Sequence, residues 1–176
     1  MLYKIRDSAP ISVLKSIYFN IFNSHLAYGL PVWGNAHCKY LEKITKLQKK
    51  AIRAITFSNF TAHTKPLLKD LKILNVKDLL YQQTASMMWD LENNLLPPSL
   101  SSYFVKTNQI HNHNTRQVSS GKYFIKKTLT TQYGINSFQV QGALVLNKLK
   151  DLDIYNNATS KKQFLNNLKI KLLNEY

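Results

Sequence analysis

The residues of this sequence that could support catalysis are few and widely separated. Phosphoryl transfer by two metal ions needs at least two carboxylates that converge on the metals. The only close acidic pairs are Asp90 with Glu92 and Asp151 with Asp153, and the second pair lies in a lysine-rich stretch without a third acid nearby. Because acidic side chains are usually solvated at the surface, we interpret the second pair as surface charges and predict no metal site.

Histidine and cysteine, which could serve as metal ligands or nucleophiles, are also few in this sequence. His111 and His113 could chelate a metal from an extended chain, and His37 adjoins the single cysteine, Cys38. Neither pair has the four-ligand spacing of a zinc site. The chain also lacks a glycine-rich phosphate loop and a Ser, His and Asp set with a nucleophile turn. The sequence therefore predicts no cofactor and no enzymatic activity for this chain alone.

Positive charge is the dominant chemical feature. The 176 residues include 24 Lys and Arg against nine Asp and Glu, a formal net charge of +15. A surface this basic repels itself unless an acidic partner screens it, and the commonest such partner is a polyphosphate backbone. We predict a nucleic-acid partner and no small-molecule substrate. The start of the chain has no secretion signal, no apolar run is long enough to span a bilayer, and one cysteine suits a reducing, intracellular compartment.

The cations are densest in residues 39–55, KYLEKITKLQKKAIRAI, which have the periodicity of an amphipathic helix. Its apolar arc consists of Tyr40, Leu41, Ile44, Leu47, Ala51, Ile52 and Ile55. The opposite, basic arc consists of Lys39, Lys43, Lys46, Lys50 and Arg53, with Lys49 and Glu42 at its edges. We predict that the apolar arc packs on a core and that the basic arc binds an anion. The alternative is that these cations are only a solvated face.

The elements that would position this helix are also predicted to be helical. A helix over residues 8–28 should end at a turn in residues 28–34, where Gly29 can adopt the left-handed cap conformation. Further helices are expected from near Thr64 and Pro66 to about Leu71, at about residues 76–91 behind an Asn75 cap, from Ser137, and after Ser160. Only Tyr123–Ile125 resembles a strand. We predict a mainly α fold with a helical bundle in residues 1–96, a linker or irregular segment with at most short strands in 97–136, and a C-terminal helical segment in 137–176.

Several short motifs along the chain resemble the region behind the catalytic palm of non-LTR (LINE-type) retrotransposon reverse transcriptases, in particular the jockey-like group. In chain order the motifs are Leu2-Tyr-Lys-Ile-Arg6 with Pro10, Tyr28-Gly-x-x-Val-Trp-Gly34, Leu47-Gln-Lys-Lys-Ala-Ile-Arg53, Leu71-Lys-Ile-Leu74, Leu95-Leu-Pro97, His111-Asn-x-Asn-Thr-Arg116, Gly134-x-x-Ser137 and Gly142-x-x-x-x-Asn147. The sequence departs from the family pattern at Leu146, where the family usually has Trp, and at Lys150, where it has Pro.

The resemblance implies a thumb-like domain in residues 1–96, which would help hold a template–primer duplex against the palm of an RNA-directed DNA polymerase. The family's catalytic aspartates and its endonuclease are absent from this sequence, so the resemblance implies a fragment that does not polymerise by itself. A palm-containing polymerase chain is a further expected partner. The basic arc of residues 39–55 would face the duplex backbone, and His111, Asn114 and Arg116 form a second expected nucleic-acid site.

Three other interpretations stay open. The chain could be a helical protein-interaction module that docks an acidic partner, or a transposon relic without a selected function. It could also bind an anionic membrane surface, but we expect no membrane partner, because the exposed helix face offers cations with no aromatic wedge.

Overall fold

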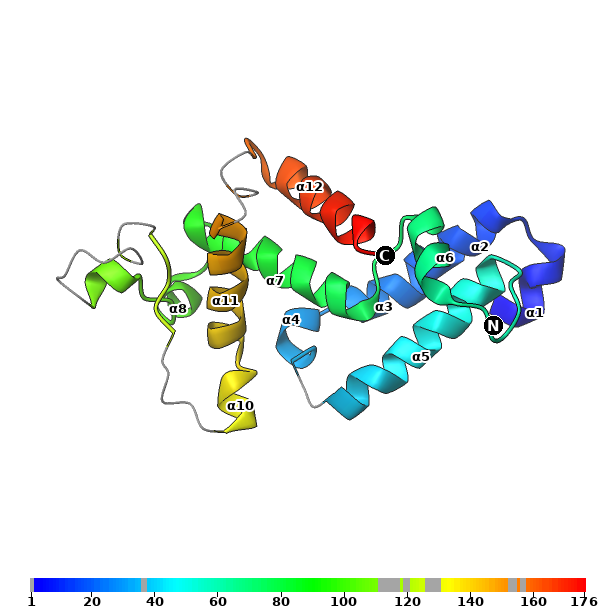
Figure 1. Cartoon of the computed structure of the whole chain (residues 1–176), viewed down its shortest axis with the longest axis horizontal. Coiled ribbons are helices and arrows are strands. Elements are labelled where there is room, and N and C mark those ends of the chain that lie inside the picture. Colours follow the sequence, from blue (N-terminus) through cyan, green and yellow to red (C-terminus); the bar gives the residue numbers. More distant parts are fainter. Residues whose placement is uncertain are drawn as a thin grey trace. The chain divides into compact units, whose positions relative to one another are not determined.

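The computed structural model describes residues 2–35, 38–110, 118, 121–125, 131–151, 155 and 158–176 (Figure 1). These residues are mainly helical, which confirms the predicted fold class. The helical segments are α1 (Leu2–Ile5), η1 (Arg6–Ser8), α2 (Ile11–Ile17), η2 (Tyr18–Asn23), α3 (Ser24–Ala27), α4 (Leu30–Trp33), α5 (Cys38–Ile55), α6 (Thr64–Leu71), α7 (Val76–Glu92), α8 (Pro98–Ser101), η3 (Thr107–Gln109), α10 (Gln132–Ile135), α11 (Phe138–Asp151) and α12 (Lys161–Asn174). The described residues contain no strand, and the predicted strand at Tyr123 is reduced to one bridge with Lys106.

Contacts divide the chain into two compact units. The first unit comprises residues 1–80 and 169–176, and the second comprises residues 81–168. The predicted division into residues 1–96, 97–136 and 137–176 stays a prediction. Helix α7 begins in the first unit and ends in the second, and the last residues of α12 belong to the first.

The N-terminal helical run of the first unit, residues 11–27, is α2, η2 and α3 joined end to end, so it covers most of the helix predicted for residues 8–28. The central segment, η2, is π-helical. Gly29 follows with a φ of 62°, as predicted for a left-handed cap, and the Trp33 indole Nε1 donates a hydrogen bond to the Tyr28 carbonyl at 2.9 Å. Gly34 must lack a side chain, because a Cβ there would lie 2.4 Å from the Leu30 carbonyl oxygen.

The core of the first unit joins this N-terminal run to α5 and α6. Its buried residues are Leu14, Tyr18, Ala51, Ile52, Ile55, Leu68, Leu71 and Ile73. The predicted cap of α7 forms, since the Asp78 backbone N–H donates to Asn75 Oδ1 at 2.9 Å. The Tyr176 hydroxyl accepts from the Asn75 backbone N–H at 2.8 Å and donates to Asp78 Oδ2 at 2.6 Å, which fastens the end of the chain to the start of α7.

The second unit packs α7 and α11 around Met88, Leu91, Tyr123, Ala143 and Leu146. Gly142 allows this packing, because a Cβ there would lie 2.7 Å from Met88 Sδ. The Asn147 side chain accepts from the Tyr123 backbone N–H at 2.9 Å and donates to the Tyr123 carbonyl at 3.0 Å. Lys150 Nζ donates to Glu92 Oε1 at 3.0 Å, which joins the end of α11 to the end of α7 by an ion pair.

Candidate nucleic-acid interface

Helix α5 matches the amphipathic helix predicted for residues 39–55, but its apolar arc is only partly covered. Ala51, Ile52 and Ile55 are buried as predicted. Tyr40 and Leu47 are 63% and 56% exposed, so the prediction that they pack on the core is wrong. Leu47 is exposed because it lines an open cavity, together with Ile44, instead of packing in a filled interior.

Gln48 fixes which side of α5 faces outward. Its side chain is 1% exposed, and its Nε2 donates to the Tyr18 hydroxyl at 3.0 Å and to the Leu74 carbonyl at 2.9 Å. Its Oε1 accepts the Val76 backbone N–H at 3.1 Å and so satisfies a free donor at the start of α7. Because Gln48 lies nearly opposite the basic arc on a helical wheel, these three bonds hold that arc toward solvent.

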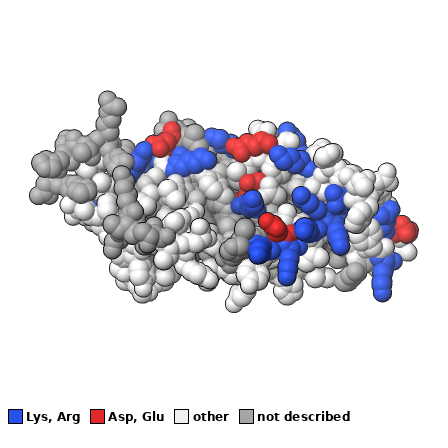
Figure 2. Space-filling view, turned by 60° about the horizontal axis from the view of Figure 1, so that its bottom comes forward, with Lys and Arg blue, Asp and Glu red and all other residues white. Residues whose placement is uncertain are grey.

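The outward side of α5, which we call its basic face, carries five lysines. Lys39, Lys43, Lys46, Lys49 and Lys50 are all exposed. Among the residues that the structure describes, none forms a side-chain hydrogen bond or an ion pair with Lys43, Lys46, Lys49 or Lys50. Lys and Arg side chains gather on the face to which α5 contributes (Figure 2). The basic face is therefore open to an external anion.

Arg53, the last cation of the predicted arc, is half-buried and already engaged. Its Nε donates to the Ala62 carbonyl at 2.9 Å, and its guanidinium carbon lies 5.9 Å from the centroid of the Phe60 ring. These contacts fix Arg53 against the loop that follows α5. Its guanidinium is thus pre-positioned at the end of the basic face, in contrast to Lys43, Lys46, Lys49 and Lys50, which have no such contact among the described residues.

The second predicted site lies outside the described residues. His111, Asn114 and Arg116 all fall in the undescribed segment 111–117. The structure therefore brings together the predicted cations of α5 but does not place these three residues, and the second site stays a prediction.

The carboxylates of the second unit form ion pairs. Lys161 Nζ lies 2.5 Å from Asp90 Oδ2, and Lys150 Nζ lies 3.0 Å from Glu92 Oε1. The Asp90 and Glu92 side chains are only 20% and 13% exposed. Asp151 pairs with Lys122 at 2.6 Å, and Asp153 is not described. No group of three His, Cys, Asp or Glu among the described residues could hold a metal ion.

The first unit has a much larger charge imbalance. It contains 15 of the 24 Lys and Arg but five of the nine Asp and Glu, a net charge of +10. It also holds a second cationic group that sequence reasoning missed, at Lys15, Lys72 and Lys169. Burial lowers the pKa of Lys169, and the positive charges of Lys15 and Lys72 lower that pKa further. No sequence signal joins residues so far apart along the chain.

The fold and this face define a mainly α protein that presents a cationic helix surface. No family model matches the chain, and no significant similarity was found to a curated protein or to a solved structure. None of the described helices combines the length and the apolar character needed to cross a membrane.

Proposed function

We propose that this chain binds the sugar-phosphate backbone of a nucleic-acid duplex through the basic face of α5. The observation that carries the proposal is the set of four exposed lysines, Lys43, Lys46, Lys49 and Lys50, that lack partners among the described residues. At about 1.5 Å per residue, Lys43 and Lys50 lie about 10 Å apart along the helix axis. A duplex presents about one negative charge per 1.7 Å of its axis, so several phosphates lie within reach of this face.

We further propose that the chain is a thumb fragment of a non-LTR retrotransposon reverse transcriptase, which binds the template–primer hybrid but lacks the catalytic palm. The family motifs support this proposal. Three of their residues have a structural role here: Gly34 and Gly142 leave no room for a Cβ, and the Asn147 side chain hydrogen-bonds to the backbone N–H and carbonyl of Tyr123. In this role the basic face would respond to phosphate position and to the shape of the shallow minor groove, not to base edges. The proposal assigns no catalytic step to this chain.

The experiment compares two triple variants for binding to a fluorescent RNA–DNA hybrid of about 20 base pairs. The test variant is Lys43→Gln with Lys46→Gln and Lys50→Gln. The matched control changes three exposed lysines of the first unit outside α5, Lys65→Gln with Lys69→Gln and Lys77→Gln. Both variants remove three charges, so a general effect of net charge is the same in each. We expect the α5 variant to lose affinity by about 100-fold at about 0.1 M salt and the control by no more than about threefold.

Two results would count against the proposal. Equal losses in the two variants would show that the charge acts diffusely instead of through α5. Absence of binding at low salt would remove the nucleic-acid partner altogether. Liposomes that contain anionic lipid provide a further comparison. We expected no aromatic side chain on the exposed face of this helix, but Tyr40 is exposed and could insert into a membrane surface beside the lysines. Co-sedimentation with liposomes but not hybrid binding would favour a membrane surface.

A further inference from the structure

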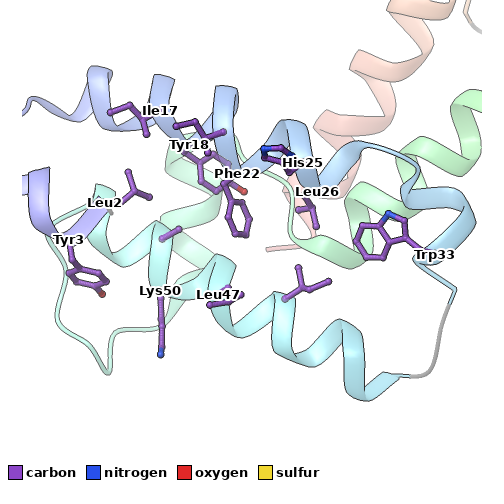
Figure 3. Close-up of a pocket in the computed structure, with 13 residues that line it drawn as sticks. Leu2, Tyr3, Ile17, Tyr18, Phe22, His25, Leu26, Trp33, Leu47 and Lys50 are labelled. Atoms are coloured by element: carbon purple, nitrogen blue, oxygen red, sulfur yellow. The ribbon is translucent and has the colours of Figure 1, made fainter.

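The first unit contains an open apolar groove that the nucleic-acid proposal does not use. It is the cavity of about 590 Å³ between the N-terminal run, residues 11–27, and α5 (Figure 3). Ile17 and Ile21 line one wall, and Ile44 and Leu47 line the other. Trp33 lies at one end (Figure 3). The exposed lining of this cavity is almost entirely apolar.

The geometry of the groove matches one more helix. Its two walls are helices that lie side by side, with side chains directed from both toward the space between them (Figure 3). Ile17 and Ile21 are four residues apart, whereas Ile44 and Leu47 are three apart, so each wall offers a helical stripe. Ile21 and Leu47 are 45% and 56% exposed and remain available for packing. An amphipathic helix places residues of the same spacing into such a groove.

The charge along the α5 edge of the groove selects the partner. Lys50 lines the cavity, but its amino end extends away from the apolar lining toward the outer side of α5 (Figure 3). Lys46 and Lys43 lie on the same outward side, about one and two turns before it. None of the described residues that line the groove is acidic. The apolar floor therefore has a cationic edge, which complements a helix with carboxylates beside its apolar stripe.

We propose that this groove docks an acidic amphipathic helix of a partner protein, with its apolar stripe between the N-terminal run and α5 and its carboxylates against Lys43, Lys46 and Lys50. A second copy of this chain is a poor occupant, because two chains of formal charge +15 repel each other. A fatty-acid anion is also a poor occupant, because the open groove leaves its chain wet and the Lys50 amino end lies outside the lining.

The probe is a fluorescent synthetic peptide of about 18 residues with Leu at helical spacing and Glu along the flanks of that stripe. One comparison peptide keeps the Leu stripe but has Lys flanks, and another scrambles the acidic sequence so that the stripe is lost. Binding to the full chain is followed by fluorescence anisotropy. We expect the acidic helix to bind at least about tenfold more tightly than either comparison peptide, which corresponds to about 1.4 kcal/mol.

Substitutions on the two walls locate the peptide. Leu47→Gln and Ile21→Gln each place a polar group at an exposed apolar position, and Leu and Gln have similar helix propensity. Ile170→Gln is the matched control, because Ile170 is 52% exposed on α12 and does not line the groove. We expect each groove variant to bind the acidic peptide about tenfold more weakly than the unmodified chain, and the control to bind it with unchanged affinity. Hybrid binding by Leu47→Gln should stay as in the unmodified chain, which separates this inference from the proposed function.

Several outcomes would overturn the inference. The scrambled acidic peptide could bind as tightly as the helix, which would reduce the effect to general charge attraction. Leu47→Gln could behave like Ile170→Gln, which would place the peptide elsewhere. Oleate could bind in place of the peptide, or Leu47→Gln could dissociate a dimer of the chain, and either result would assign the groove another occupant. Loss of hybrid binding in Leu47→Gln would make the groove part of the nucleic-acid site.

Discussion

At the scale of single residues, Gln48 has the greatest influence on the candidate site. It lies on α5 but bonds to Tyr18, Leu74 and Val76, so one buried amide links three segments of the first unit. Helical periodicity assigns Gln48 to the buried side of α5, but its partners are 26 to 30 residues away in the sequence. The sequence therefore predicts where this side chain faces but not what it binds.

Removal of this amide should be costly. We expect Gln48→Leu to lower the free energy of unfolding by about 3 kcal/mol, because the Leu74 carbonyl and the Val76 N–H lose their partner while remaining buried. Urea denaturation followed by circular dichroism measures the change. Gln83→Leu is the matched control, since Gln83 is a half-buried glutamine on α7, and it should change the same quantity by less than about 0.5 kcal/mol. Similar losses in both variants would contradict the role assigned to Gln48.

Tyr18 makes the fold sensitive to alkali. Burial raises the pKa of Tyr18 to about 12 from a usual value of 10.0, although the hydrogen bond from Gln48 lowers it slightly. The unfolded side chain loses its proton first, so its contribution to stability is complete below pH 10.0 and falls as the pH rises toward 12. Tyr123, Tyr155 and Tyr176 act in the same direction, because burial also raises the pKa of each.

The alkaline loss can be assigned to Tyr18 by substitution. We expect the free energy of unfolding to fall between pH 9 and pH 11 in the unmodified chain, and to fall less steeply in Tyr18→Phe, because one ionising group is gone. Tyr123, Tyr155 and Tyr176 should keep this slope negative in the variant. Urea denaturation at a series of pH values gives both slopes. Identical slopes would show that Tyr18 has a similar pKa in the folded and unfolded chain.

At the scale of elements, the helix boundaries were the most predictable feature. A short helix that starts near Thr64 and Pro66 and ends at about Leu71 was predicted, which agrees with α6, and α7 ends one residue beyond the predicted Leu91. The start of α7 has a side-chain cap at Asn75, and caps and periodicity are local properties of the sequence. The exposure of Tyr40 and Leu47 was not predictable, because a helical wheel defines a face but does not show whether a neighbouring element covers it. The ion pair of Asp90 with Lys161 likewise joins residues 71 positions apart.

The end of α6 offers a test of helix termination. Lys72 has a φ of 56°, a left-handed conformation that side chains other than Gly and Asn rarely adopt. We expect Lys72→Gly to raise the free energy of unfolding by about 1 kcal/mol, because glycine removes this strain and the charge next to Lys169 disappears. Asn94→Gly is the control at the end of α7, where Asn already tolerates a φ of 56°. Thermal unfolding that shows no difference between the two variants would refute the expected strain.

At the scale of the whole molecule, the distribution of charge distinguishes the two units. The sequence predicts the total of +15, but only the structure separates paired from unpaired cations. In the second unit Asp90, Glu92 and Asp151 pair with lysines, whereas the basic face of α5 has no such carboxylate partner among the described residues for Lys43, Lys46, Lys49 and Lys50. The first unit therefore carries both the proposed nucleic-acid face and the acidic-helix groove. Because both use Lys43, Lys46 and Lys50, the two ligands should compete.

The salt dependence of hybrid binding tests the central claim most directly. Each phosphate neutralised by a lysine releases counterions, so a plot of log affinity against log salt has a slope of about −0.9 per contact for a duplex. We expect a steep negative slope for the unmodified chain between about 50 and 200 mM salt, and a slope shallower by about three for Lys43→Gln with Lys46→Gln and Lys50→Gln. The control variant at Lys65, Lys69 and Lys77 should keep the original slope. Binding that is insensitive to salt, or the same slope in the unmodified chain and the α5 variant, would contradict a backbone interface on α5.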